Sequence, residues 1–257
     1  MREVATVQTT ASGNDIPMPT ENDTSNKGAI LAENAQITEQ DITFGSTTLN
    51  AYMYTSKLVR VSMQLMQDSA FDMNSFLGVK LGERIARIHN EHFTTGTGSS
   101  QPQGVATAAV TGVTAASATA ITYAEIVDLE HSLDPAYRNN ARFMMKDSTL
   151  QILKKLVDGD SRPLWTAGVA SGEQDRLLGY PYVINQDMPA ATTGLDSLLF
   201  GDFSKYMIRD VAGAGLMRLT ERYADYLQVG FFAFMRSDGK LLDAGTNPIK
   251  TLQMAAA

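Results

Sequence analysis

The chain has 257 residues, of which 44% are hydrophobic, 19% charged and 8% aromatic, the proportions of an ordinary globular protein of one to two domains. Its net charge of −7 argues against a dedicated nucleic-acid binder, which needs clustered Lys and Arg to neutralise phosphates. The lack of cysteine excludes disulfides, thiol nucleophiles and thiolate metal sites. No apolar run approaches the roughly 18 residues that span a membrane.

The first 63 residues read as strands and loops. Residues 2–9 alternate Val4 and Val7 with polar neighbours, which predicts a strand. Residues 12–28 contain prolines, glycines and turn formers, so we expect a long loop without a helix or a central strand. Residues 29–63 are rich in Thr, Tyr, Ile and Val and read as two or more strands. A two-stranded arm with few large apolar residues is marginal alone, so it needs a partner from its own chain or another.

A long amphipathic helix is predicted over residues 73–95. Apolar residues and one histidine recur there at three- and four-residue steps: Phe76, Leu77, Leu81, Ile85, Ile88 and His92. Asp72 or Asn74 can cap its start, and Gly96 supplies a permissive backbone for its end. At about 1.5 Å per residue, a helix from 74 to 95 is about 33 Å long. Because strand-like sequence lies on both sides of it, we expect a structural helix against which sheets pack.

Short elements follow the helix. Residues 95–122 are nearly free of charge and predict a loop with one short strand near Val110. Thr122 and Glu125 form a capping box for a helix that ends before Asp134. Residues 141–146 read as a buried strand.

A second short helix and a loop come next. Asp147 or Ser148 caps the helix, which continues through Leu156. Residues 158–175 predict a loop that Trp165 pins to the core.

The remaining residues read as β-structure. Residues 177–189 contain a strand, and 198–203 and 205–211 look like paired strands, with a further strand at 216–222. A long apolar strand follows over 226–236, and Asp238-Gly239 is a hairpin signal. Strands, short helices and strands again predict an α+β architecture.

The sequence contains no recognisable active site. His89 and His92 stand three apart, but no third ligand has a metal-site spacing, so we expect one surface and one semi-buried histidine. Gly96-Thr97-Gly98 follows a helix, whereas phosphate-binding glycine loops follow a strand, so this motif reads as the end of the helix and not as a phosphate site. Asp158-Gly159-Asp160 lacks the further ligands of a calcium loop and reads as a turn. We therefore expect no catalytic residue, no metal and no cofactor.

Several stretches, in this order, resemble the major capsid protein family of tailed phages, which has the Hong Kong 97 (HK97) fold. They are 30–69, the long helix with 92–105, and then 133–165, 177–189, 198–210 and 231–252. The resemblance covers nearly the whole chain. It implies an α+β HK97-type capsid fold with a long spine helix, an extended β-hairpin called the E-loop, a peripheral domain and an axial domain.

The resemblance also implies domain bounds. Residues 1–27 would be an N-terminal strand and arm of the peripheral domain, and 28–62 the E-loop. Residues 63–121 would carry the spine helix of the peripheral domain. The axial domain would comprise 122–222, and 223–257 would return to the peripheral domain.

The function implied is structural. Hexamers and pentamers of the chain would close into an icosahedral phage head around packaged double-stranded DNA, assembled in the host cytoplasm, with the E-loop over the adjacent subunit. Partners would be copies of the chain, a scaffolding segment or protein, and portal and decoration proteins, with no membrane. The expected assembly-interface residues lie near the E-loop tip: Glu39, Gln40, Asp41, Thr43, Phe44 and Ser46.

Two departures from the family pattern matter. Some members have a cleaved N-terminal scaffolding segment; here only the first strand follows Met1, so we expect that segment to have been removed or to lie outside this sequence. Others form Lys–Asn isopeptide links, but Gly45, Ser46 and Thr47 follow the E-loop stretch, and Val229-Gly230-Phe231 stands where an Asn is needed. Cross-linking is therefore not expected.

Two alternatives remain. The first is an encapsulin-type nanocompartment shell protein, although encapsulins usually begin with a cargo-docking helix and residues 2–9 do not read as one. The second is an α+β enzyme with an unrecognised site.

The missing lysine and asparagine give a testable expectation. Shells boiled in detergent should run on a denaturing gel as one band near 27.9 kDa, because no isopeptide bond joins the subunits. A ladder of covalent oligomers would contradict it.

Overall fold

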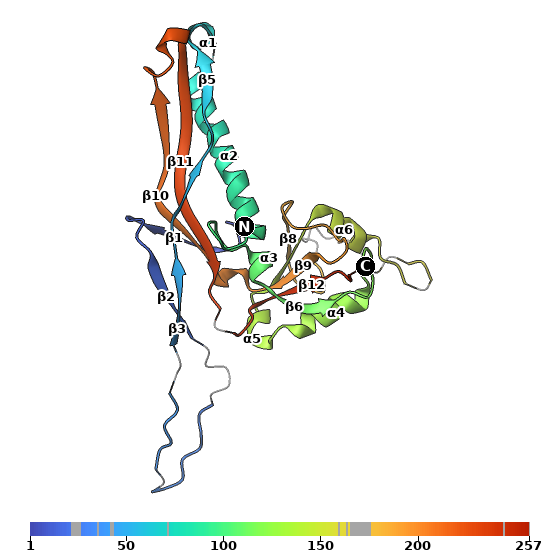
Figure 1. Ribbon diagram of the computed structural model, residues 1–257. Helices are drawn as coiled ribbons and strands as arrows, with labels where there is room; N and C mark the ends of the chain where they lie inside the picture. Colours follow the sequence, from blue (N-terminus) through green and yellow to red (C-terminus); the bar gives the residue numbers. More distant parts are fainter. Residues whose placement is uncertain are drawn as a thin grey trace. The chain divides into compact units, whose positions relative to one another are not determined.

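The fold is described from a computed structural model, which describes residues 1–21, 27–34, 36–41, 44–70, 72–158, 160–162, 164, 176–243 and 245–256. The chain divides into two compact units. Unit 1 comprises Met1–Asp15, Leu49–Thr107 and Met207–Lys240, and unit 2 comprises Ile16–Thr48, Ala108–Tyr206 and Leu241–Ala257. Figure 1 shows the elements of both units.

Unit 1 is a long twisted sheet with a helix along it (Figure 1). The strand order is β1-β10-β11-β4, and β5 also pairs with β11. The strands are β1 (Thr6–Thr10), β4 (Tyr52–Thr55), β5 (Val59–Ser62), β10 (Tyr206–Leu219) and β11 (Gln228–Leu241). The helices are α1 (Met63–Asp68), α2 (Met73–Thr95), α3 (Val105–Ala108) and the 3-10 turn η2 (Ala224–Tyr226).

The core of unit 1 lies between α2 and this sheet. Leu77, Leu81 and Ile85 of the helix pack with Val229 and Phe231 of β11. Each side chain is at most 8% exposed, and burying one contributes about 1.5–3 kcal/mol. The helix therefore takes its stability from one apolar stripe held against the sheet.

Unit 2 contains a mixed sheet of order β6-β12-β9-β7-β8. Its strands are β6 (Val110–Thr114), β7 (Arg142–Met145), β8 (Tyr182–Ile184), β9 (Asp196–Gly201) and β12 (Ile249–Gln253). The outer strands β6 and β8 run parallel to their neighbours, and the inner pairs are antiparallel. The other elements are α4 (Tyr123–Ser132), α5 (Pro135–Arg138), α6 (Asp147–Lys154), η1 (Phe203–Lys205) and a two-stranded sheet of β2 (Ile16–Glu21) and β3 (Phe44–Leu49).

Many of the expected elements are confirmed. The long helix has the predicted bounds, with the Asp72 side chain accepting from the Asn74 amide. The Thr122–Glu125 capping box begins α4. Phe143, Met144 and Met145 are wholly buried in β7. The α+β class is likewise correct.

The buried face of α2 differs from the predicted one. Phe76 is 48% exposed, and His89 rather than His92 is the buried histidine. With 3.6 residues per turn, positions 77, 81, 85 and 89 form one slowly turning stripe, and the sheet covers only that stripe.

Gly96 ends the helix for a different reason from the one expected. Its φ of −58° is open to any residue, but an added Cβ would overlap the carbonyl oxygens of His92 and Pro102. Close backbone approach, not conformational freedom, requires glycine there. At α6 the cap is Lys146, without a side-chain bond, and Asp147 is the first helical residue.

The predicted strand pairings near the C-terminus are wrong. β9 lies between β12 and β7, whereas β10 pairs with β1 and β11. Asp202 separates them by capping η1 through a bond from the Ser204 amide, so the chain enters another sheet instead of turning back. The strand expected at 216–222 is the second part of β10, which continues through Ala212 (φ 55°) and Gly213 (φ 79°) as an irregularity.

Asp238-Gly239 does not form a hairpin, since both residues lie inside β11. The Asp238 carboxylate accepts from the backbone amides of Asn50 at 2.6 Å and Gly239 at 2.8 Å. The Asp side chain that would support a turn instead fixes a neighbouring segment.

The segment at 12–28 contains a strand that was not expected. β2 includes Pro17 and Pro19, which lack an amide hydrogen. A two-stranded sheet leaves a free edge on each strand, so prolines can be accommodated there.

The hairpin and unit bounds also differ from those implied by the resemblance. β3 pairs with β2, while β4 and β5 belong to the sheet of unit 1, so the hairpin is not formed within 28–62. Residues 207–222 belong to unit 1 and 241–257 to unit 2, opposite to the bounds expected for the axial domain and the return strands. The long strands β10 and β11 pair with β1 and β4, which holds 207–240 in unit 1. Trp165 lies outside the described residues.

No helix in the described part of the chain is both long and apolar enough to cross a membrane.

The two helix glycines give a matched prediction. Gly96→Ala should lower the free energy of unfolding, because the new methyl group meets two backbone carbonyls that cannot move independently. Gly82→Ala, inside α2 with nothing within 4 Å of an added Cβ, should raise it by about 0.5–1 kcal/mol. Urea unfolding of both variants tests this, and equal effects would contradict it.

Candidate assembly surfaces

We call residues 16–48 the arm. The described residues from 27 to 41 form neither helix nor strand and are all exposed. They include large apolar side chains: Ile30 is 102% exposed, Leu31 53% and Ile37 73%. The arm thus presents apolar side chains to solvent.

The predicted interface residues fall into two groups. Glu39, Gln40 and Asp41 lie in the exposed segment, and Phe44 and Ser46 lie on β3. Phe44 and Ser46 share a face of the strand because successive side chains alternate, and Phe44 is 68% exposed. Thr43 lies outside the described residues.

The segments on both sides of the arm are joined by Arg209, which is fully buried in β10. Its guanidinium donates to the carbonyl oxygens of Leu49 at 2.9 Å, Asn50 at 3.1 Å and Ser12 at 2.8 Å, and to Thr10 Oγ1 at 3.1 Å. One side chain therefore fixes the chain before β2 and the chain after β3.

Two more side chains hold the same segments. Asp238 accepts from the Asn50 amide, and Arg236 donates to the carbonyl oxygens of Ala51 at 3.4 Å and Gly13 at 3.2 Å. An added Cβ at Gly13 would overlap the Arg236 guanidinium. Burial raises the pKa of Asp238, although the bonds from Asn50 and Gly239 oppose it. We call Arg209, Arg236 and Asp238 the root clamp.

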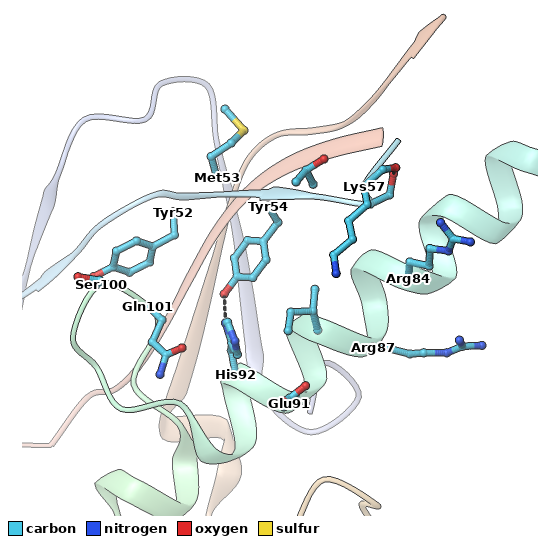
Figure 2. A pocket seen from close by; sticks show the side chains of 13 residues that line it. Tyr52, Met53, Tyr54, Lys57, Arg84, Arg87, Glu91, His92, Ser100 and Gln101 are labelled. Carbon is cyan, nitrogen blue, oxygen red and sulfur yellow. Dashed lines mark hydrogen bonds between the residues drawn. The ribbon is translucent and has the colours of Figure 1, made fainter. Parts of the chain in front are cut away.

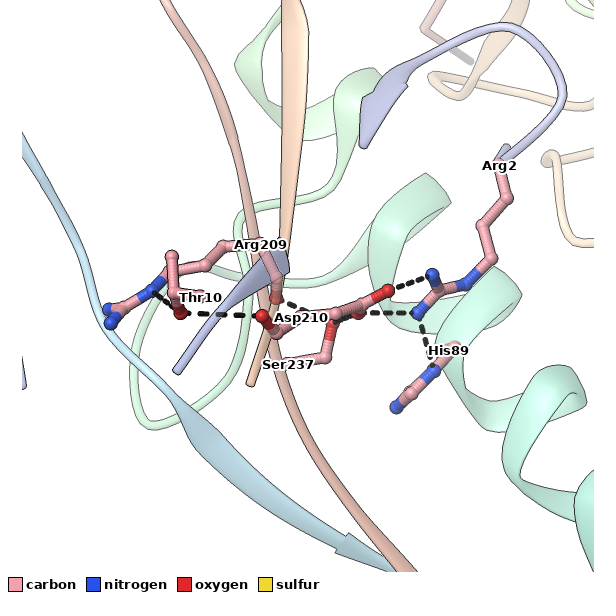
Figure 3. A network of polar contacts seen from close by, with 6 residues as sticks. All are labelled: Arg2, Thr10, His89, Arg209, Asp210 and Ser237. Carbon is pink, nitrogen blue, oxygen red and sulfur yellow. Dashed lines mark hydrogen bonds and ion pairs between the residues drawn. The ribbon is translucent and has the colours of Figure 1, made fainter. Parts of the chain in front are cut away.

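Asp210, the next residue of β10, points to the opposite face of the strand from Arg209 and belongs to a second network of polar contacts (Figure 3). Arg2 donates to both carboxylate oxygens of Asp210, at 2.6 Å and 2.9 Å, and Ser237 Oγ donates to Asp210 at 2.8 Å. Burial alone raises the pKa of Asp210, but these bonds and the charge of Arg2 outweigh it, so its pKa is below the usual value. The network joins the N-terminal segment to β10 and β11.

His89 completes this network from α2. Arg2 Nη2 lies 3.1 Å from His89 Nδ1 and can only donate, so the imidazole proton is assigned to Nε2. Burial, then the charge of Arg2, lowers the pKa of His89 to about 4. Nε2 has no hydrogen-bond partner among the described residues, and the ring meets that of Tyr54 at 87° with centroids 4.2 Å apart. His89 is thus a neutral core residue near pH 7.

His92 has a separate partner. Its Nδ1 lies 2.9 Å from the Tyr54 hydroxyl. In the described part of the chain, no three His, Cys, Asp or Glu side chains are grouped as metal ligands would be.

A groove of about 590 Å³ lies between β4 and α2 (Figure 2). Lys57, Arg84, Arg87, Glu91 and Gln101 line it, with apolar surface from Tyr52, Met53 and Ile88. Sequence reasoning did not find this groove or the root clamp. The available signal for the root clamp was an arginine, Arg209, within a sequence that otherwise reads as a strand.

Comparison with known proteins identifies the family. The family model described as the phage capsid family matches residues 1–254. The chain belongs to the phage capsid family. No curated protein matches the sequence.

Solved capsid structures agree with this assignment. The capsid of a native GTA particle, computed with C5 symmetry, is 27% identical with a TM-score of 0.85, and the match covers 99% of this chain and 89% of that chain. A Microbacterium phage Oxtober96 chain is 17% identical with a TM-score of 0.75, covering 98% and 90%. A Gordonia phage Cozz chain is 15% identical with a TM-score of 0.71, covering 100% and 86%. The last two show the fold alone.

The chain is therefore a major capsid protein of HK97-type fold, a structural component of a virion. The predictions of the family and of the fold are confirmed.

The root clamp of this capsid protein predicts a large effect of Arg209→Met. The substitution keeps side-chain volume but leaves three buried carbonyl oxygens without their donor, which should cost roughly 3 kcal/mol or more. The exposed Arg218→Met on the same strand should stay within about 0.5 kcal/mol of the parent. Urea unfolding measures both, and hydrogen exchange should locate the loss at residues 10–13 and 49–51. Equal stabilities would refute the clamp.

His89 predicts a pH dependence. Its folded pKa of about 4 lies below the unfolded value of 6.5, so the unfolded state binds more protons as pH falls. The stability is complete above pH 6.5 and is lost as pH falls towards 4, by about 2–3 kcal/mol between pH 7 and 4.5. His89→Gln, which can still accept from Arg2, should lose that much less over this range. Identical slopes for parent and variant in urea titrations would contradict it.

Proposed function

We propose that this capsid protein forms hexamers and pentamers that close into an icosahedral head around packaged double-stranded DNA. The arm of each subunit lies over an adjacent subunit. The observation that carries this proposal is the exposed arm: every described residue between 27 and 41 is exposed. Such a segment adds little to the stability of its own subunit.

The magnitude of the exposure supports a partner for the arm. Ile30, Ile37 and Phe44 are each at least two-thirds exposed, and burying one such side chain contributes about 1.5–3 kcal/mol. A subunit interface that covered them would recover this free energy. Repeated around a closed shell, modest contacts of this kind add up to a stable particle.

The root clamp fits the same role. It fixes the chain at Ser12 and at Leu49-Asn50, where the arm begins and ends. Ordering these ends before assembly reduces the conformational entropy lost when the arm binds.

The acidic charge of the chain is compatible with a DNA container. DNA inside a closed shell is held by confinement, so the shell needs no sequence-specific binding and the net charge of −7 is no obstacle. The partners we propose are further copies of the chain, a scaffolding segment or protein, and portal and decoration proteins. Assembly takes place in the host cytoplasm, and the chain has a structural, not a catalytic, role.

Shortening the arm tests the proposal. Residues 22–43 are replaced by a short Asn-Gly turn, which keeps β2 and β3 but removes the exposed segment. We expect near-parental urea unfolding of the isolated subunit, because the described residues of this segment, 27–34 and 36–41, are exposed, together with loss of closed shells. Sedimentation and negative-stain imaging measure the shells.

The parent protein is the control and should form rings or shells under the same conditions. Normal shells from the shortened chain would place the arm outside the assembly interface. A parent that stays monomeric at every salt and pH, with a scaffolding segment supplied, would overturn the proposal itself.

A further inference from the structure

The groove between β4 and α2 is cationic on an acidic chain. Three cations, Lys57, Arg84 and Arg87, line it against one carboxylate, Glu91. Arg87 is paired with Glu83 at 3.5 Å, whereas Lys57 and Arg84 form no ion pair within the described ranges. The groove therefore has positive charge available for an anionic partner.

Its lining combines this charge with apolar surface. Met53 is 63% exposed, and Tyr52 and Ile88 are partly buried beside it. Figure 2 shows the Lys57 side chain extending from the strand towards α2, with Arg84 and Arg87 on the facing helix. A fitting partner thus carries both carboxylates and an aliphatic side chain.

The backbone at Lys57 has a left-handed conformation, which is unusual for a residue other than glycine. β4 and β5 both pair with β11, and between them Ser56 bonds to Ala233 through its amide at 2.9 Å and its hydroxyl at 2.8 Å. Lys57 follows with φ of 61°, a left-handed conformation that a residue with a Cβ adopts at a cost of about 1–2 kcal/mol. This irregularity in the strand directs the Lys57 side chain into the groove.

Residues 36–41 of the arm have the complementary pattern. Ile37, Glu39 and Asp41 stand two apart, so they share one face when the segment is extended. Adjacent side chains on that face are about 7 Å apart. Arg84 and Arg87, three apart on a helix, lie about 5–6 Å from each other and can meet the two carboxylates.

We infer that this groove binds residues 36–41 of a second copy of the chain, with Ile37 over Met53 and Ile88 and with Glu39 and Asp41 facing Lys57, Arg84 and Arg87. The inference rests on the proposed function, because it names the surface on which the arm of a neighbouring subunit lies. A DNA backbone would match the cations but would leave Met53 and Ile88 uncovered, so the arm fits the groove better.

Cross-linking between two single-cysteine chains tests this contact, since the chain has no cysteine of its own. Ile37→Cys and Met53→Cys chains are assembled together into shells without DNA, treated with a short bis-maleimide and run on a denaturing gel. We expect a strong band at twice the subunit mass. Either chain assembled alone should give at least tenfold less.

The matched control replaces Met53→Cys by Val79→Cys. Val79 is 62% exposed, as Met53 is 63%, but it lies on α2 outside the groove lining. This pair should give only background. Equal dimer from both pairs, or none from the Met53 pair in well-formed shells, would overturn the inference.

Charge reversal gives an independent measurement. Arg84→Glu in the Met53→Cys chain should lower the dimer yield severalfold, and Glu39→Arg in the Ile37→Cys chain should restore it. Loss without restoration would show that Arg84 and Glu39 do not face each other across the contact and would overturn the inference. If the parent chain forms no shells, the proposed function fails; if shells form without the cross-link, only the inference fails.

Discussion

The buried guanidinium of Arg209 holds together segments that are almost 200 residues apart in sequence. A charge placed in a protein interior is costly unless its donors are satisfied, and each hydrogen-bonding edge of this side chain has a backbone or hydroxyl acceptor. The three carbonyl acceptors belong to Ser12, before β2, to Leu49, the last residue of β3, and to Asn50, which follows it.

The placement of charge in unit 1 follows from the alternation of side chains along β10. Arg209 and Asp210 are neighbours in sequence but face opposite sides of the strand. One side fixes the chain around the arm, and the other fixes the N-terminal segment to α2 through Arg2 and His89. A single strand therefore ties the N-terminal segment, the residues that follow β3 and the long helix into unit 1, which also carries the cationic groove.

Local features of the sequence predicted local structure well. The Thr122–Glu125 box, the cap at Asp72 and the apolar run at 143–145 act through neighbours within a few residues, and all three are present in the structure. Residues 29–63 were predicted as a two-stranded arm that needs a partner, whereas the described residues from 27 to 41 form no strand and are exposed. Its interface residues Glu39, Asp41 and Phe44 were selected by resemblance, and their contacts stay a prediction.

Local sequence patterns could not predict which distant segments pair. The Asp238-Gly239 signal was misleading because the Asp238 carboxylate binds the amide of Asn50, 188 residues away, and not a turn of its own. The groove lies between β4 and α2, and no spacing in sequence relates Lys57 to Arg84.

The sequence by itself determined the α+β class, the long helix and the capped helix α4, since these depend on periodicity, capping and composition. Only the tertiary structure decided which strands pair, which face of α2 is buried and where Arg209 places its donors. Those choices depend on which distant surfaces meet, because apolar burial and hydrogen bonding have no preference for partners that are near in the chain.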